Sequence, residues 1–381
     1  MGINKRFDLI SRTIKKGFRL PIMIILFIIC VPQIFNSQVK GATPDSENGE
    51  IKKFNAGEVI IDHILDAYDW HIADYGGSHI SIPLPVILYY EGKWYFFLSS
   101  KFYHGTKPHK GFRIAQEGPK KGKIIRVLDD GITPDTHASF LLDLSITKNV
   151  FSIFIAVFLL FWIMRTVAKN YLHCGPKRAP QGLAAFIEPL ILFVRDDIAR
   201  TAIPANKVDK FLPYLLSLFF FIFFNNLLGL VPFFPGGANV TGNISVTFVL
   251  AMFTFFTLHL FANKSYWQHI FNTPGVPIWL KLPIPLLPII ELVGVFVKPL
   301  VLMLRLFANI TAGHMIILGF VSLIFVLGSS GVAMGLAISP LSVVFIIFMN
   351  FLELLVAFIQ AYVFTFFSAI FFGMAVPEEH H

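Results

Sequence analysis

Long apolar runs separated by short polar stretches dominate the second half of the chain. A helix needs roughly 20 consecutive apolar residues to cross a bilayer. Five runs approach or exceed this length, at residues 149–167, 211–234, 244–262, about 284–328 and about 338–375. The last two are much longer than a perpendicular span, so we expect them to be tilted. The pattern predicts an all-α polytopic membrane protein with about five membrane helices.

The segment at 182–200 differs from these runs because it mixes apolar and charged residues at helical spacing, with Pro189 interrupting the pattern. An amphipathic helix of this kind lies on a membrane surface and does not cross it. The runs at 211–234 and 244–262 predict a membrane hairpin over an uncharged loop. The lysine-bearing segment 263–281 then returns the chain to the side from which the hairpin started.

The first 147 residues have a different character. Residues 1–42 begin with a basic stretch and a short apolar run, which is typical of a secretory signal peptide, with an uncleaved signal anchor as the alternative. Residues 43–147 are charged, aromatic and rich in turns, and predict a small β-containing soluble domain. We expect a hairpin around Glu91-Gly92-Lys93 and a strand within 123–131. The membrane domain then occupies 148–381.

Composition and charge narrow the class of protein. Hydrophobic residues make up 55% of the 381 residues and charged residues only 14%, which argues against a soluble enzyme. The net charge is +8, but the basic residues cluster beside apolar runs, so nucleic-acid binding is not expected. Lys169, Lys177 and Arg178 predict that the loop after the first span is cytoplasmic. Residues 43–147 are then extracytoplasmic, and the C-terminus is cytoplasmic.

The sequence predicts no cofactor and no metal site. Cys30 and Cys174 lie in unlike contexts and indicate no disulfide. Half of the histidines fall in the soluble domain, without the spacing of zinc ligands. These are His63, His71, His79, His104, His109 and His137. Residues 118–124 superficially resemble a phosphate-binding loop, but they lack its glycine spacing and the Ser or Thr after its lysine.

Few charged residues interrupt the apolar region between residues 282 and 377. They are Glu291, Lys298, Arg305 and Glu353. A charge at the middle of a membrane costs roughly 2.5–3.5 kcal/mol, so each of them is a functional candidate. For Lys298, which lies nearer the end of its span, a side chain that reaches the headgroups is the alternative.

Helical spacing groups these charges into a polar stripe. Glu291, Lys298 and Arg305 are seven residues apart and therefore fall on one face of a helix. Asn309, four residues after Arg305, shares this face. His314 lies nine residues after Arg305 and is expected to point the opposite way.

A second polar stripe falls on the last span, where Glu353 and Gln360 are also seven residues apart. Two such stripes on consecutive helices predict an ion path. Arginine has a pKa above about 12 and does not relay protons, so Arg305 would supply a fixed positive field. His314 and Glu353 can titrate, and a helical hairpin could bring them within hydrogen-bonding reach.

The stretch LVLMLRLFANITAGHMI at 300–316 resembles the signature of subunit a of F-type ATP synthases. The spacing of Glu291, Lys298-Pro299 and Arg305 is similar to that of this family. The stretches EPLILFV and FFNNLLGLVP resemble its earlier segments, and FIQAYVFTFFSAIFFGMAVPEEHH resembles its last helix and tail. The resemblance covers about 148–381 and says little about 43–147.

This resemblance implies a proton-channel subunit in a bacterial inner membrane, assembled with a ring of c subunits, a b-subunit stalk and the remaining ATP synthase. The resemblance also implies that such a subunit has no enzymatic activity by itself. Arg305 would face the ring carboxylates between two half-channels, with Asn309 and Gln360 nearby. The ion carried, H⁺ or Na⁺, stays open.

Two departures from the family pattern concern the outer access route. His314 and Glu353 are exchanged in type relative to much of the family. Acidic positions of the family are replaced by Asn243 and Gly229. We therefore expect the outer route to have a different lining.

Two other classes of membrane protein use buried charges. A stand-alone proton- or sodium-coupled secondary transporter is expected to carry an inverted internal repeat, and the sequence shows none. An intramembrane hydrolase needs a nucleophile–base pair or a metal motif among its helices, and neither is found in the sequence.

Overall fold

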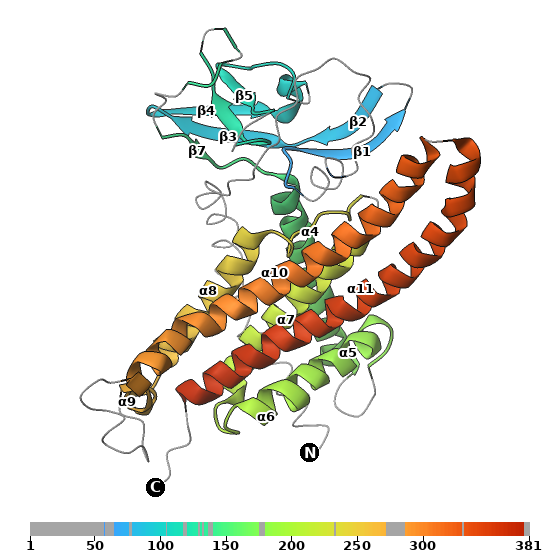
Figure 1. Cartoon of the computed structure of the whole chain (residues 1–381). Coiled ribbons are helices and arrows are strands. Elements are labelled where there is room, and N and C mark those ends of the chain that lie inside the picture. Colours follow the sequence, from blue (N-terminus) through green and yellow to red (C-terminus); the bar gives the residue numbers. More distant parts are fainter. Residues whose placement is uncertain are drawn as a thin grey trace.

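The computed structural model of the protein describes residue 57 and residues 65–75, 78–103, 105–116, 120–128, 130–131, 133–135, 140–174, 180–231, 234–271, 286–329 and 331–376. The expected signal peptide at 1–42 lies outside the described residues. Figure 1 shows a β-rich part at one end of a group of long helices. The predicted combination of membrane helices with a small β-containing region is confirmed.

The β-rich part contains three small antiparallel sheets. The first pairs β1 (Asp69–Tyr75) with β2 (Ser78–Pro83), and the third pairs β5 (Phe112–Ile114) with β6 (Ile124–Arg126). The second has the order β4-β3-β7, formed by Lys93–Leu98, Pro85–Tyr90 and Leu142–Asp143. A 3-10 turn, η1 (Ser99–Phe102), follows β4.

The predicted hairpin is confirmed as β3 and β4, joined by Glu91 and Gly92. Both turn residues have positive φ angles, of 48° and 79°, which glycine adopts without strain. Leu88 and Phe112 are fully buried between this sheet and the β5–β6 pair. The strand expected within 123–131 is confirmed as β6.

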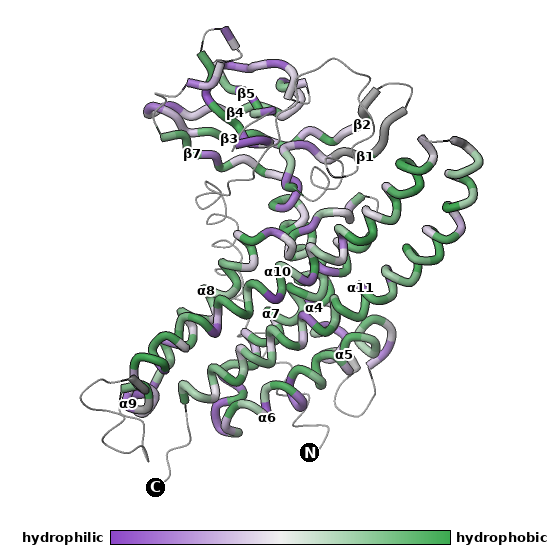
Figure 2. Tube along the Cα trace, viewed as in Figure 1, coloured by the Kyte–Doolittle hydropathy of each residue, from purple (hydrophilic) through white to green (hydrophobic). Residues whose placement is uncertain are grey.

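Five helices are long and apolar enough to cross a membrane, by length and composition, in the described part of the chain. They are α4 (Lys148–Cys174), α7 (Val208–Leu230), α8 (Ile244–Phe261), α10 (Leu286–Gly328) and α11 (Val332–Ala375). Their surfaces are mostly hydrophobic in Figure 2. Their number and order confirm the sequence prediction.

The two longest helices, α10 and α11, pack along each other and run obliquely to α4 (Figure 1). At 43 and 44 residues, each is roughly 65 Å long at 1.5 Å per residue, about twice the hydrocarbon thickness of a bilayer. The helix α11 begins at Val332, six residues before the predicted start. The turn between the two helices is therefore shorter than the sequence indicated.

The segment predicted as a surface helix forms α5 (Leu183–Phe193), a π-helical stretch η2 (Val194–Ala199) and a short α6 (Arg200–Ala202). It lies at the end of the helices opposite the β-rich part (Figure 1). Pro189 sits inside α5 and does not break it, so the expected interruption there is wrong. The irregular turn comes after it, in η2. A short helix, α9 (Lys264–Phe271), also forms where we expected a loop.

One continuous hydrophobic core joins the helices and reaches into the β-rich part. Phenylalanine rings supply much of it: Phe211 stacks on Phe372, with ring centroids 4.9 Å apart, and Phe193 packs between α7 and α11. Trp70 of β1 belongs to the same core and is only 4% exposed. The two parts of the molecule are thus held together by buried aromatic contacts.

Candidate functional site

Arg305 lies on the exposed face of α10. The neighbouring side of this helix carries Leu302, Leu306 and Ile310, which are buried against the rest of the molecule. The guanidinium carbon of Arg305 is 5.2 Å from the centre of the Phe367 ring on α11. The helix therefore presents a permanent positive charge outward, beside an aromatic ring at the junction of the two longest helices.

The predicted polar stripe on α10 follows the same side of the helix. Lys298 and Asn309 are exposed like Arg305, whereas Glu291 is half-buried near the start of the helix. Burial and the nearby Glu291 carboxylate raise the pKa of the Tyr266 hydroxyl in α9. The seven-residue spacing has therefore placed these polar groups on the outward side of α10, as helical geometry requires.

His314 points inward and meets Glu353 of α11. The Nδ1 atom of His314 is in hydrogen-bond contact with the Oε1 atom of Glu353, and the two side chains are only 14% and 3% exposed. The second carboxylate oxygen, Oε2, is buried and has no hydrogen-bond partner among the described residues. The pair combines two titratable groups with one free acceptor, so it can hold or pass a proton.

Two glycines make room for this pair. A Cβ atom on Gly313 would lie 3.1 Å from Oε1 of Glu353. A Cβ atom on Gly229 of α7 would lie 3.6 Å from Nε2 of His314 and 3.4 Å from the Ala238 carbonyl oxygen. Gly229, which stands where the resemblance led us to expect an acidic residue, therefore lies directly beside the imidazole of His314.

A cluster of buried amides and hydroxyls joins α7, α10 and α11 to the loop between α7 and α8. The Thr241 hydroxyl donates to Oδ1 of Asn226 at 2.5 Å, and Nδ2 of Asn226 donates to the Ala357 carbonyl at 3.3 Å. The Thr311 hydroxyl donates to the Gly242 carbonyl at 3.3 Å. We call Asn226, Asn239, Thr241 and Thr311 the loop-side polar cluster. Each of its members is at most 9% exposed.

The loop-side polar cluster was missed by sequence reasoning. The paired asparagines at 225 and 226 and the uncharged loop were visible, but nothing local indicated that the loop folds back between the helices. Asn239 accepts a hydrogen bond from the Gly242 amide through Oδ1, while its Nδ2 is buried without a partner in the described structure. The cluster therefore retains polar atoms able to bind water.

The remaining predicted residues lie at separate places. Asn243 caps the start of α8, because its Oδ1 accepts the Ser245 amide at 3.0 Å. Gln360 is buried on α11, 6% exposed, so it does not share the outward exposure of Asn309. The structure brings together His314 and Glu353 and separates both from the outward side chain of Arg305.

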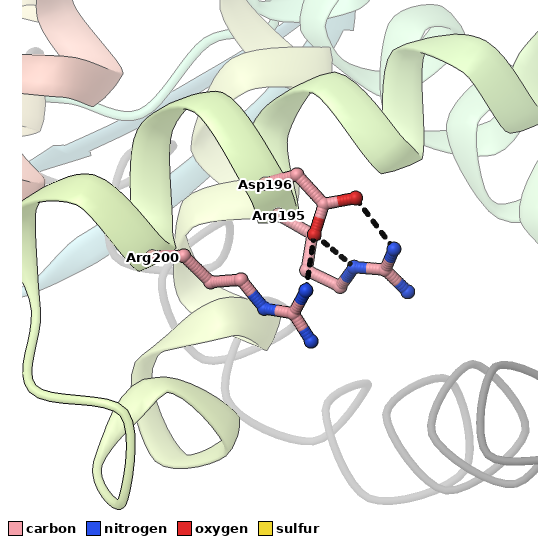
Figure 3. A network of polar contacts seen from close by, with 3 residues as sticks. All are labelled: Arg195, Asp196 and Arg200. Atoms are coloured by element: carbon pink, nitrogen blue, oxygen red, sulfur yellow. Dashed lines mark hydrogen bonds and ion pairs between the residues drawn. The ribbon is translucent and has the colours of Figure 1, made fainter. Parts of the chain in front are cut away.

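A further charged group, also missed from the sequence, lies in η2 at the opposite end of the helices. Arg195 is 2% exposed and binds Asp196 through two nitrogen atoms, at 2.9 and 2.6 Å. Arg200 binds the same carboxylate at 2.7 Å (Figure 3). Two guanidinium groups on one carboxylate stabilise the π-helical turn itself, which packs against α7 and α11.

Two protein-family models match this chain, each over a different part of it. The family model described as ATP synthase A chain matches residues 150–373. A second model, described as Domain of unknown function (DUF8433), matches residues 59–144.

Several curated proteins are similar over the helical part of the chain. ATP synthase subunit a of Chloroherpeton thalassium is 40% identical over 244 residues, which cover 63% of this chain and 69% of the relative. ATP synthase subunit a 2 of Prosthecochloris aestuarii is 43% identical over 244 residues, covering 63% and 71%. ATP synthase subunit a 2 of Chlorobium luteolum is 41% identical over 251 residues, covering 65% and 70%. With its membrane helices, its polar sites on α10 and α11 and these matches, the chain belongs to the ATP synthase subunit a family.

Proposed function

We propose that the chain is the proton-channel stator subunit of a rotary F-type ATP synthase. In this proposal α10 and α11 form two half-channels against a ring of c subunits, and Arg305 separates the half-channels. The outward position of the Arg305 guanidinium, between apolar surfaces of two long membrane helices, is the observation that carries the proposal.

The free-energy cost of a charge in lipid indicates that the Arg305 side chain faces a partner. An arginine side chain that faced lipid at this depth would cost roughly 2.5–3.5 kcal/mol even on the most lenient scale. A partner that presents carboxylates within the membrane removes this cost and gains a charge-assisted contact. A ring of c subunits with membrane carboxylates is such a partner. A stand-alone transporter would be expected to cover such a charge with its own helices.

The position of the His314–Glu353 pair supports two separate half-channels. Arg305 and His314 are nine residues apart, which is roughly 13 Å along the helix axis and half a turn around it. Protons would enter by the loop-side polar cluster, pass to the His314–Glu353 pair and then to a ring carboxylate. After almost a full turn of the ring they would leave on the other side of the membrane.

In this mechanism Arg305 has two tasks. Its charge repels a proton that would otherwise cross directly between the half-channels. It also pairs with the deprotonated ring carboxylate and so lets that site pass the interface without a proton. The driving force is roughly 2.3 kcal/mol for each charge that crosses 100 mV.

The proposal extends to the assembly and its location. The b-subunit stalk and the catalytic part of the ATP synthase would complete the complex, and ATP chemistry would take place on those other subunits. The chain would lie in a bacterial inner membrane, with 43–147 extracytoplasmic and the C-terminus cytoplasmic.

Arg305→Ala tests the function directly. The variant should assemble with the ring, because the side chain is exposed and packs little of the core, but it should lose proton-driven ATP synthesis. Arg305→Lys should also lose most activity, since a compact ammonium lacks the planar fork of the guanidinium. The measurements are co-purification of the ring and ATP synthesis in energised inverted vesicles. Normal coupled synthesis by Arg305→Ala vesicles would refute the proposal.

A further inference from the structure

The β-rich part carries an unusual exposed face on its three-stranded sheet. Alternate residues of β3 and β4 point away from the core, and they are Pro85, Ile87, Tyr89, Trp94, Phe96 and Leu98. We call these six the outer sheet face. None of them is charged. Trp94 is 52% exposed, Phe96 63% and Leu98 48%.

These side chains form one continuous surface because they are paired across the two strands. Tyr89 lies opposite Trp94, Ile87 opposite Phe96, and Pro85 opposite Leu98. The Trp94 ring contacts both the Tyr89 ring, at 4.9 Å, and the Phe96 ring, at 6.0 Å. A sheet that faced water would place polar residues at these positions. An ordered apolar surface of this kind marks a site of contact with another body.

The position of the sheet indicates what that body is. The Ile146 amide donates to the Pro85 carbonyl at 2.9 Å, so pairing with β3 continues until two residues before α4 begins. The Lys148 amide donates to the Ala67 carbonyl at 2.8 Å. The outer sheet face therefore lies next to the start of α4, the first of the helices long enough to cross a membrane (Figure 1).

A second set of contacts, made by β1 and the residues around it, holds the β-rich part against the helices. The Trp70 ring packs edge-on against Phe151 of α4, at 5.8 Å, and against Phe234 of the α7–α8 loop, at 5.4 Å. The Asn149 amide also donates to Oδ1 of Asp66 at 3.0 Å. These contacts, centred on the buried Trp70, join the β-rich part to the helices.

The residue types agree with a lipid surface. Tryptophan and tyrosine are enriched at membrane–water interfaces, where an amphipathic ring sits at headgroup level. Lys93 begins β4 and Lys101 follows it in η1, so an exposed lysine stands near each end of the strand. Lysines in this position can bind lipid phosphates while their stems cover apolar surface.

We propose that the outer sheet face is a membrane-binding surface, on which Trp94, Phe96 and Leu98 enter the headgroup region of the lipid leaflet next to the start of α4. This inference does not rest on the proposed proton pathway. It gives the β-rich part a role of its own, which is to fix the loop-side end of the helices against the bilayer.

The test uses a fluorescent label on the full chain in its complex, reconstituted into vesicles. In a background with Cys30→Ser and Cys174→Ser, Phe96→Cys is labelled with an environment-sensitive dye. Lys120→Cys, exposed in the turn of the β5–β6 pair that covers the inner side of the sheet, is the matched control. Trp94→Cys provides a second reading on the outer sheet face.

We expect lipids brominated near the headgroup to quench the labels at 96 and 94 and to leave the label at 120 unaffected. Aqueous iodide should quench the label at 120 and spare the other two. Iodide quenching of all three labels would overturn the proposal, because the face would then be in water. Protection of 96 and 94 from both quenchers would also overturn it, because a protein would then cover the face.

Discussion

His314 of α10 and Glu353 of α11 are 39 residues apart in the chain and meet in a hydrogen-bond contact within the membrane helices. Both side chains are largely buried, with 14% of His314 and 3% of Glu353 exposed. The contact also gives a physical reason for the exchanged residue types relative to much of the family. We propose that such a pair needs one carboxylate and one imidazole in contact, whichever helix supplies each.

Exchanging the two residues tests whether they act as a pair. Glu353→Gln should impair proton conduction, and His314→Glu should place two carboxylates together and disfavour ionisation of both. The double exchange, His314→Glu with Glu353→His, should recover more activity than the single variants predict if their effects were independent. ATP-driven proton pumping in inverted vesicles measures all of them. Strict additivity would show that the residues act separately.

Gly313 should be needed for the geometry of Glu353. In Gly313→Ala the new methyl group would lie 3.1 Å from Oε1 and 3.2 Å from the carboxyl carbon, so the carboxylate must shift by a few tenths of an ångström. We expect slower proton pumping without loss of assembly. Gly319→Ala on the same helix is the matched control, because a Cβ atom there would meet nothing within 4 Å. Equal effects of both variants would point to helix propensity as the cause.

Gly373 should be needed for stability more than for conduction. A Cβ atom at this position would lie 1.9 Å from the Ala202 carbonyl oxygen, so Gly373→Ala must displace the backbone that joins α6 to α7. Overpacking of this kind typically costs about 1–3 kcal/mol. The thermal midpoint of the purified complex should fall, whereas Gly319→Ala should leave it close to the wild-type value. An unchanged midpoint would show that α11 does not approach Ala202 this closely.

The orientation in the membrane that we expect from the basic loops can be measured separately. In a background without native cysteines, Glu91→Cys in the β3–β4 turn should react with an impermeant thiol reagent in intact spheroplasts. Arg178→Cys, between the first span and α5, should react only after permeabilisation. Reversed labelling would invert the assignment of the two half-channels. It would leave the family assignment unchanged.

Much of the fold was accessible from the sequence because it depends on local patterns. The five membrane helices follow from the length of the apolar runs, since a backbone in lipid must satisfy its hydrogen bonds within the helix. The outward stripe of Lys298, Arg305 and Asn309 follows from helical periodicity alone. The β3–β4 hairpin follows from a two-residue turn with glycine between two β-prone runs.

Other features could not be derived from local patterns. The sequence of the α7–α8 loop does not indicate that Thr241 and Asn239 insert between helices. The sequence of the outer sheet face resembles that of ordinary aromatic strands, so it does not indicate that this face is exposed. The helix α9 and the continuous passage of α5 through Pro189 also depend on packing against neighbours, which overrides local propensity.

The candidate site contains both features that follow from the local sequence and features that depend on the tertiary structure. The sequence determined by itself that Arg305 and His314 point to opposite sides of one helix, because nine residues correspond to two and a half turns. It allowed Glu353 to reach His314, but it could not specify which turn of α11 lies beside which turn of α10. The tertiary structure decided that register, through side-chain packing between two helices of more than 40 residues and through the space left by Gly313 and Gly229. Contacts between residues far apart in the chain depend on how whole surfaces fit, and no local pattern encodes that fit.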